Sequence, residues 1–108
     1  MLDIATIKAE VAVLAERNGA AFALLFGSYA RGTATERSDV DLIIVQETAA
    51  PFLRRLDAYY EALAGRIEAA VEILVYTPAE FAAIRSRPFI RQALSEGIVL
   101  YESGKVQP

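Results

Sequence analysis

The sequence predicts an α/β fold in which a small β-sheet is flanked by helices. Apolar runs of strand length alternate along the chain with segments whose apolar residues recur at helical spacing, a pattern typical of this class. No repeat, low-complexity segment or long linker divides the 108 residues. A chain of this length favours a single domain over residues 1–108, and a content of 55% apolar residues is enough for a buried core.

The first helix is predicted over residues 4–17. Asp3 is suited to cap its beginning, and Asn18 followed by Gly19 is suited to end it. One side of this helix carries apolar residues at Ile4, Ile7, Val11 and Leu14. A continuous apolar run then predicts a buried, central strand over residues 21–27.

A short helical turn and a polar loop are expected between the first and second strands. The turn is predicted over residues 28–32 and the second strand over residues 39–46. Pro51 suits the first position of the next helix, which Gly65 would end. The apolar stripe of this helix is formed by Leu53, Leu56, Tyr60 and Leu63. We expect the aromatic pair at residues 59–60 to serve packing.

A third strand is predicted over residues 70–76. Thr77 and Glu80 then form a capping-box pattern with Pro78 at the first helical position, and this helix should end before Pro88. 

The last predicted elements are a helix over residues 89–96, closed by Gly97, and a short strand over residues 98–101. We expect the tail at residues 103–108 to be frayed. Four basic residues are interpreted as solvated positions on helix surfaces: Lys8, Arg54, Arg55 and Arg66.

The composition excludes several kinds of catalytic site. The chain has no cysteine and no histidine, so it cannot form thiolate or histidine zinc sites, Ser-His-Asp triads or cysteine nucleophiles. Its net charge of −3 argues against general nucleic-acid binding. No window is apolar and long enough to span a membrane, and the N-terminus does not resemble a signal peptide, so we expect a cytoplasmic protein without membrane contact.

The stretch over residues 27–41 contains the candidate residues for a catalytic or binding site. Gly27 and Ser28 end the first strand, and Asp39 and Asp41 lie at the start of the second. Alternation along a strand puts the two aspartates on one face, about 7 Å apart. Taken singly, the Gly-Ser pair suits an ordinary turn and Asp39 suits a turn cap. The combination favours a metal site, because chance produces it on the order of once in a thousand sequences of this length.

The residue types fit the binding of a nucleoside triphosphate with Mg²⁺. Gly27 allows the backbone to approach a phosphate, and Ser28 offers a hydroxyl and the amides of a starting helical turn. Asp39 and Asp41 supply the hard oxygen ligands that Mg²⁺ prefers, and two ions about 4 Å apart would lower the pKa of an attacking hydroxyl. Arg31 is a further candidate for contact with the triphosphate. Arg37 is a weaker candidate.

The stretch resembles the polymerase-β-like nucleotidyltransferase superfamily, and most closely its minimal nucleotidyltransferase branch. The shared residues are Gly27, Ser28, Asp39 and Asp41, with Ala30-Arg31-Gly32 and Ser38 as their usual surroundings. The resemblance implies a mixed β-sheet, two Mg²⁺ ions and transfer of a nucleoside monophosphate to a hydroxyl. In the family a third carboxylate on a neighbouring strand completes the metal site. The family usually has aspartate there, whereas this chain offers Glu72, which we expect to be both metal ligand and catalytic group.

The resemblance also suggests the acceptor. Relatives that modify small molecules or tRNA carry a large acceptor domain, and this short chain is expected to take its acceptor from a partner. In the minimal branch the partner is a HEPN-domain ribonuclease toxin, whose tyrosine receives AMP from ATP, and the nucleotidyltransferase acts as the antitoxin. The alternatives are a degenerate module that neutralises its partner by binding alone, and an enzyme acting on a small molecule or RNA. The high apolar content predicts a homo- or hetero-oligomer.

Overall fold

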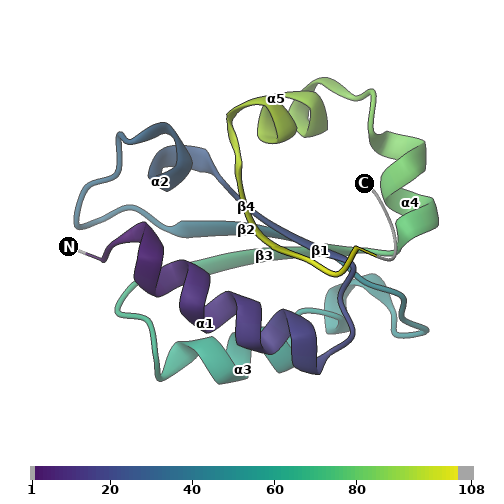
Figure 1. Ribbon diagram of the computed structural model, residues 1–108, viewed down its shortest axis with the longest axis horizontal. Helices are drawn as coiled ribbons and strands as arrows, with labels where there is room; N and C mark the ends of the chain where they lie inside the picture. Colours follow the sequence, from purple (N-terminus) through teal and green to yellow (C-terminus); the bar gives the residue numbers. More distant parts are fainter. Residues whose placement is uncertain (1, 105–108) are drawn as a thin grey trace.

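The computed structural model describes residues 2–104, which form a four-stranded sheet between two layers of helices (Figure 1). The strands are β1 (Phe22–Phe26), β2 (Val40–Val45), β3 (Val71–Tyr76) and β4 (Ile98–Glu102). Their order across the sheet is β3-β2-β1-β4. The α/β prediction is therefore confirmed. Of the tail predicted to fray, residues 105–108 lie outside the described part of the chain.

The sheet is mixed, as the resemblance implied. β1 is antiparallel to both of its neighbours, β2 and β4, whereas β2 and β3 are parallel. β1 occupies a central position, which agrees with its uninterrupted apolar sequence. The parallel pairing requires a crossover between β2 and β3, and a helical segment supplies it.

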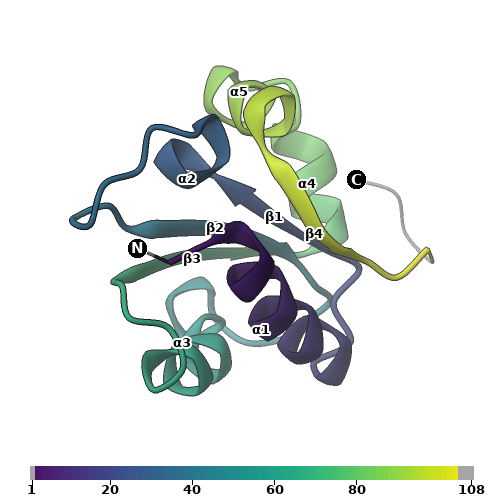
Figure 2. The same ribbon diagram turned by 60° about the vertical axis from the view of Figure 1, so that its left-hand side comes forward.

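Helices cover both faces of the sheet. On one face lie α1 (Ile4–Arg17) and α3 (Asp57–Ala64), and on the other lie α4 (Pro78–Ile84) and α5 (Pro88–Glu96) (Figures 1 and 2). The short helix α2 (Gly27–Arg31) follows β1 directly and packs beside α5.

Alternate residues of β2 enter different halves of the core. Val40, Leu42 and Ile44 are buried with the side chains of α1 and α3. Ile43 and Val45 are buried with those of α4 and α5. Asp41 has the same parity as this second pair, so it belongs to the α4 and α5 face.

Local capping signals in the sequence are confirmed. The Asp3 carboxylate accepts a hydrogen bond of 2.8 Å from the Thr6 N–H at the start of α1. At the start of α4, the Thr77 side chain accepts from the Glu80 N–H, and the Glu80 carboxylate accepts from the Thr77 N–H. Each cap satisfies helix N–H groups that have no partner within the helix.

The predicted helix after Pro51 was wrong in its start and in its phase. A 3₁₀ turn, η1 (Phe52–Arg54), comes first, and α3 begins only at Asp57. A 3₁₀ turn and an α-helix have different numbers of residues per turn, so the change from η1 to α3 alters which side chains face the core. As a result Tyr59 is fully buried, whereas Tyr60 is 51% exposed and Leu53 is 79% exposed.

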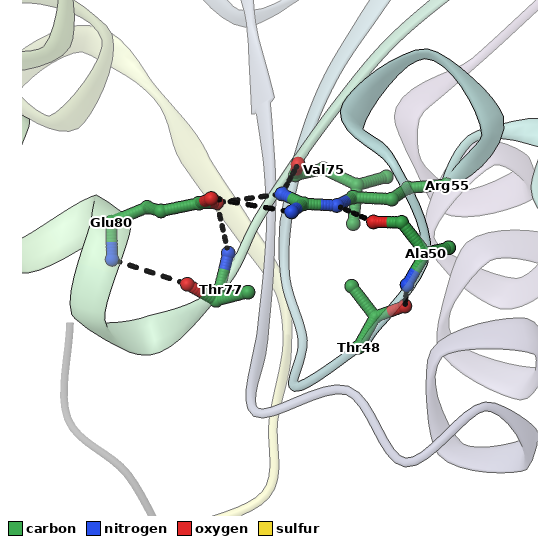
Figure 3. Close-up of polar contacts among 6 residues, drawn as sticks. All are labelled: Thr48, Ala50, Arg55, Val75, Thr77 and Glu80. Atoms are coloured by element: carbon green, nitrogen blue, oxygen red, sulfur yellow. Dashed lines mark hydrogen bonds and ion pairs between the residues drawn. The ribbon is translucent and has the colours of Figure 1, made fainter.

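Arg55 is not a solvated surface residue, contrary to the interpretation from sequence (Figure 3). Its guanidinium makes two bonds to the Glu80 carboxylate, of 2.6 and 3.2 Å. It also donates to the carbonyl oxygens of Ala50, at 2.8 Å, and Val75, at 3.3 Å. Arg55 therefore joins the segment after β2 to the end of β3 and the start of α4. A sequence pattern gives no sign of such a contact between distant segments.

We expect Glu80→Gln to destabilise the protein at neutral pH but not in strong acid. The hydrogen bonds from Arg55, followed by that from the Thr77 N–H, lower the pKa of Glu80 from 4.5 to about 2. The ionised carboxylate therefore contributes stability above pH 4.5, and this contribution is lost as the pH falls towards 2. At pH 7 the variant should melt several degrees below the wild type, and near pH 2 the two should coincide.

Thermal unfolding followed by circular dichroism from pH 2 to 7 measures this difference. Glu61→Gln, at an exposed position of α3, is the matched control and should leave the melting temperature unchanged. Equal melting temperatures for Glu80→Gln and the wild type at pH 7 would contradict a stabilising role for the Arg55–Glu80 pair.

Within residues 2–104, no helix is both long and apolar enough to cross a lipid bilayer.

Candidate active site

Gly27 and Asp41 are brought together by the pairing of β1 with β2. Phe26, the last residue of β1, lies opposite Asp41, so the next residue along the chain meets the Asp41 side chain. Gly27 has a φ of +75°, a conformation that other residues adopt only at a cost. A Cβ at this position would overlap the Asp41 carboxylate and would lie only 3.1 Å from its Cγ. The geometry therefore requires glycine here.

Asp41 and Glu72 lie side by side on adjacent strands. The parallel register of β2 and β3 pairs them directly, and the Glu72 carboxyl lies close enough to raise the pKa of Asp41. The pKa of Asp41 is raised from 3.8 to about 6, first by burial, then by the hydrogen bond and charge of Glu72, and then by the charge of Asp39. Two carboxylates this close repel each other when both are charged, and a bound cation would compensate that charge.

Asp39 and Arg31 complete the charged surroundings of Asp41. Asp39 is exposed and immediately precedes β2, which begins at Val40 and ends at Val45, a little inside the predicted limits. The positive charge of Arg31 opposes the rise in the pKa of Asp41. The structure thus gathers Gly27, Arg31 and the three predicted acids in one region.

Ser28 lies next to Gly27 in the first turn of α2. Its carbonyl oxygen accepts a hydrogen bond of 3.0 Å from the Thr33 N–H, which holds the following loop against the helix. Gly32 ends α2 with a φ of +76°, the left-handed conformation common at helix ends. The Gly-Ser pair and the glycine four residues later therefore shape one tight turn between β1 and the loop that leads to Asp39.

The acidic residues fit a divalent cation by their chemistry. All three supply carboxylate oxygens, which Mg²⁺ prefers, and the pKa of Asp41 is raised first by burial and then by the neighbouring acids Glu72 and Asp39. In residues 2–104, however, no group of three or more acidic side chains is arranged so that it could hold a metal ion. The structure brings Asp41 and Glu72 into contact, while Asp39 acts on Asp41 through its charge.

Sequence reasoning missed the contribution of α5 to this region. Glu96, at the end of α5, forms an ion pair of 3.6 Å with Arg31. Phe89, at its beginning, packs against the Phe26 ring, with the ring centres 5.5 Å apart. Neither residue belongs to a recognisable motif, because the approach of α5 to α2 is a tertiary contact between segments distant in the chain. The sequence therefore carried no signal for them.

A family comparison identifies the class of protein to which this fold belongs. Residues 10–105 match the family described as Polymerase beta, Nucleotidyltransferase. The match covers most of the chain, and the chain therefore belongs to the polymerase β nucleotidyltransferase family. No curated protein gives a significant match.

Several solved structures share the fold. A toxin–antitoxin crystal structure with AMP-PNP has a TM-score of 0.65 at 21% identity, over 89% of this chain and 73% of that one. A mutant of the toxin–antitoxin MntA-HpeT gives 0.64 at 19% identity, over 89% and 73% of the two chains. The toxin–antitoxin MntA-HepT gives 0.57 at 15% identity, over 91% and 72%. At these identities the likeness shows the fold alone.

Proposed function

We propose that this protein is an antitoxin that transfers AMP from ATP to a hydroxyl, that of a tyrosine, on a partner HEPN ribonuclease toxin. The observation that carries the proposal is the pairing of Asp41 with Glu72 on adjacent strands, with Asp41 held against Gly27. The described toxin–antitoxin structures support the choice of partner.

In this proposal, one group of residues binds the triphosphate and the acidic residues bind the metal ions that activate the acceptor. Gly27 and Ser28 would hold the triphosphate at the turn that follows β1, and Arg31 would add positive charge beside it. Asp39, Asp41 and Glu72 would hold two Mg²⁺ ions, which when bound withdraw charge from the triphosphate and acidify the acceptor hydroxyl. 

The transfer itself is a displacement at phosphorus. The acceptor oxygen forms a bond to the α-phosphorus, the bond from that phosphorus to the bridging oxygen breaks, and pyrophosphate leaves. The proton of the acceptor hydroxyl passes to the Glu72 carboxylate, which is paired in register with Asp41. Glutamate in place of the usual aspartate keeps the charge and lengthens the side chain by one methylene.

Incubation with the protein encoded by the neighbouring gene, which the proposal expects to be the toxin, together with [α-³²P]ATP and Mg²⁺ tests the proposal. We expect label on the toxin, none when EDTA is added, and none with the Asp39→Ala/Asp41→Ala double variant. In the same preparations, ribonuclease activity of the toxin should fall only where label is transferred.

The alternatives give different results in the same experiment. If the unlabelled toxin is fully neutralised by the double variant, the protein is a binding module and the enzymatic proposal is wrong. If the wild type labels RNA or a small molecule and leaves the toxin unlabelled, the proposed acceptor is wrong. The acidic composition argues against RNA, since binding it requires a basic groove.

A further inference from the structure

A small groove lies between α2 and α5, adjoining the acidic site. Its volume is about 150 Å³, and its walls include Phe26 and Gly27 at the end of β1, Arg31 on α2, and Phe89, Gln92 and Glu96 on α5. The two helices that form it lie next to each other in Figure 2. Gly27 and Arg31 belong both to this groove and to the site around Asp41, so the two spaces are continuous.

The groove presents an aromatic ring to solvent. Phe89 is 51% exposed, yet its ring is fixed by an edge-to-face contact with Phe26, at 5.5 Å between centres and 88° between planes. Phe26 is the direct strand partner of Asp41. An exposed and immobilised aromatic ring one residue away from the acidic site is a suitable surface on which a planar base can stack.

A polar chain runs along the α5 wall of the same groove. The Gln92 side-chain amide donates to one Glu96 carboxylate oxygen at 3.3 Å, and the other Glu96 oxygen faces Arg31 at 3.6 Å. An ionised carboxylate only accepts hydrogen bonds, so Glu96 fixes the orientation of the Gln92 amide. The Gln92 carbonyl oxygen and its second N–H are then directed elsewhere and remain able to bind.

The Gln92 amide and the size of the groove favour adenine over guanine. A glutamine amide that offers one acceptor and one donor is the partner that adenine accepts, through its 6-amino group and a ring nitrogen. Guanine presents an oxygen acceptor at the 6-position, which would face the amide oxygen. The groove is smaller than the 300–1,000 Å³ typical of sites for whole ligands, and it suits a single base rather than an entire nucleotide.

We propose that the groove between α2 and α5 binds the adenine base of the nucleotide substrate, with Phe89 as the stacking surface and Gln92 as the residue that distinguishes adenine from guanine. This assignment rests on the proposed function, because it requires a triphosphate bound at Gly27 and the acidic residues. Glu96 is a positioning residue in it, since it acts on the base only through Gln92.

Isothermal titration calorimetry with Mg²⁺ and three ligands, ATP, GTP and inorganic tripolyphosphate, tests the assignment. Wild-type protein should bind ATP about tenfold more tightly than tripolyphosphate, the gain expected from one stacked base. Phe89→Leu should remove this gain and leave tripolyphosphate affinity unchanged, whereas Phe89→Tyr should keep it. Gln92→Leu should reduce the preference for ATP over GTP from about tenfold to none.

Tyr60→Ala is the matched control. Tyr60 is also 51% exposed and lies on a helix, but on the opposite layer of the sheet, so its removal should not change any of the three affinities. A melting curve for each variant shows that it is folded.

The ligands separate the failure of this inference from the failure of the proposed function. If ATP and tripolyphosphate bind the wild type equally well, or Phe89→Leu behaves like Tyr60→Ala, the base site is wrong and the nucleotidyltransferase proposal stands. If GTP binds as tightly as ATP, the role of Gln92 is wrong. If neither ATP nor tripolyphosphate binds, both proposals fall.

Discussion

Asp41→Asn is expected to abolish nucleotidyl transfer and, at the same time, to make the metal-free protein more stable. If Asp41 holds Mg²⁺ as proposed, loss of its carboxylate removes several kcal/mol of transition-state stabilisation, which corresponds to a fall of about a thousandfold in rate. The neutral amide also removes the repulsion between Asp41 and Glu72, two acids paired in register on β2 and β3. Function and stability should therefore change in opposite directions.

The stability gain should depend on pH in a defined way. The pKa of Asp41 is raised to about 6 in the folded protein, from an ordinary 3.8. Between these two values the folded protein holds a proton that the unfolded chain has released, so increasing pH through this window lowers the stability of the wild type. Asp41→Asn should therefore melt a few degrees higher than the wild type at pH 7.5, and the difference should vanish near pH 4.

Melting curves in EDTA across this pH range, together with the transfer assay, measure both effects. Glu72→Gln should give a smaller stability gain, because it removes the charge of Glu72 but leaves the burial that is the first cause of the raised Asp41 pKa. Asp57→Asn, at the start of α3, provides a control on the opposite face of the sheet. A lower melting temperature for Asp41→Asn at pH 7.5 would show that the carboxylate is stabilising and would contradict this account of the site.

The second large effect is expected from the smallest substitution, Gly27→Ala. The added methyl group faces two penalties: the left-handed backbone at φ +75°, which costs about 1–2 kcal/mol, and overlap with the Asp41 carboxylate. Displacing a catalytic carboxylate by about 1 Å can cost a hundredfold in rate. We expect Gly27→Ala to lose at least this much transfer activity and to lose more stability than the backbone penalty alone explains.

Gly19→Ala separates the two penalties. Gly19 has nearly the same backbone angle, φ +71°, but nothing lies within 4 Å of an added Cβ. It should therefore lose only the backbone contribution and keep its activity. Denaturant unfolding of the two variants, and of Gly27→Ala/Asp41→Ala, measures the clash directly, because truncating Asp41 should recover part of the stability. Equal destabilisation at both glycines would show that Gly27 does not contact Asp41 closely.

Features set by neighbours in sequence were predictable, and features set by distant segments were not. Asp3 and the Thr77–Glu80 capping box allowed the starts of α1 and α4 to be predicted, because a cap acts within one helical turn. The closeness of Gly27 to Asp41 followed from a single antiparallel pairing between consecutive strands. These parts of the fold and candidate site could be read from the sequence.

The errors lie where a long-range contact decides the outcome. Arg55 becomes enclosed only because β3 and α4 bring Val75 and Glu80 to it, and neither is near in sequence. The burial of Tyr59 instead of Tyr60 depends on a 3₁₀ turn that resets the helical phase. The groove wall on α5 was missed for the same reason. Glu72 was found because it is the only acid of its strand, and its partner in register became known from the structure.

The chain must complete the whole crossover from β2 through α3 before Asp41 and Glu72 can meet. The two residues stand thirty-one positions apart, whereas Phe26 and Asp41 are joined by a shorter antiparallel connection. Contacts between distant residues form late because closing a longer loop costs more entropy. By this argument the acidic pair forms after the pairing of Phe26 with Asp41, and repulsion between its two carboxylates opposes the docking of β3. A cation that binds both carboxylates would stabilise this docking as well as the site.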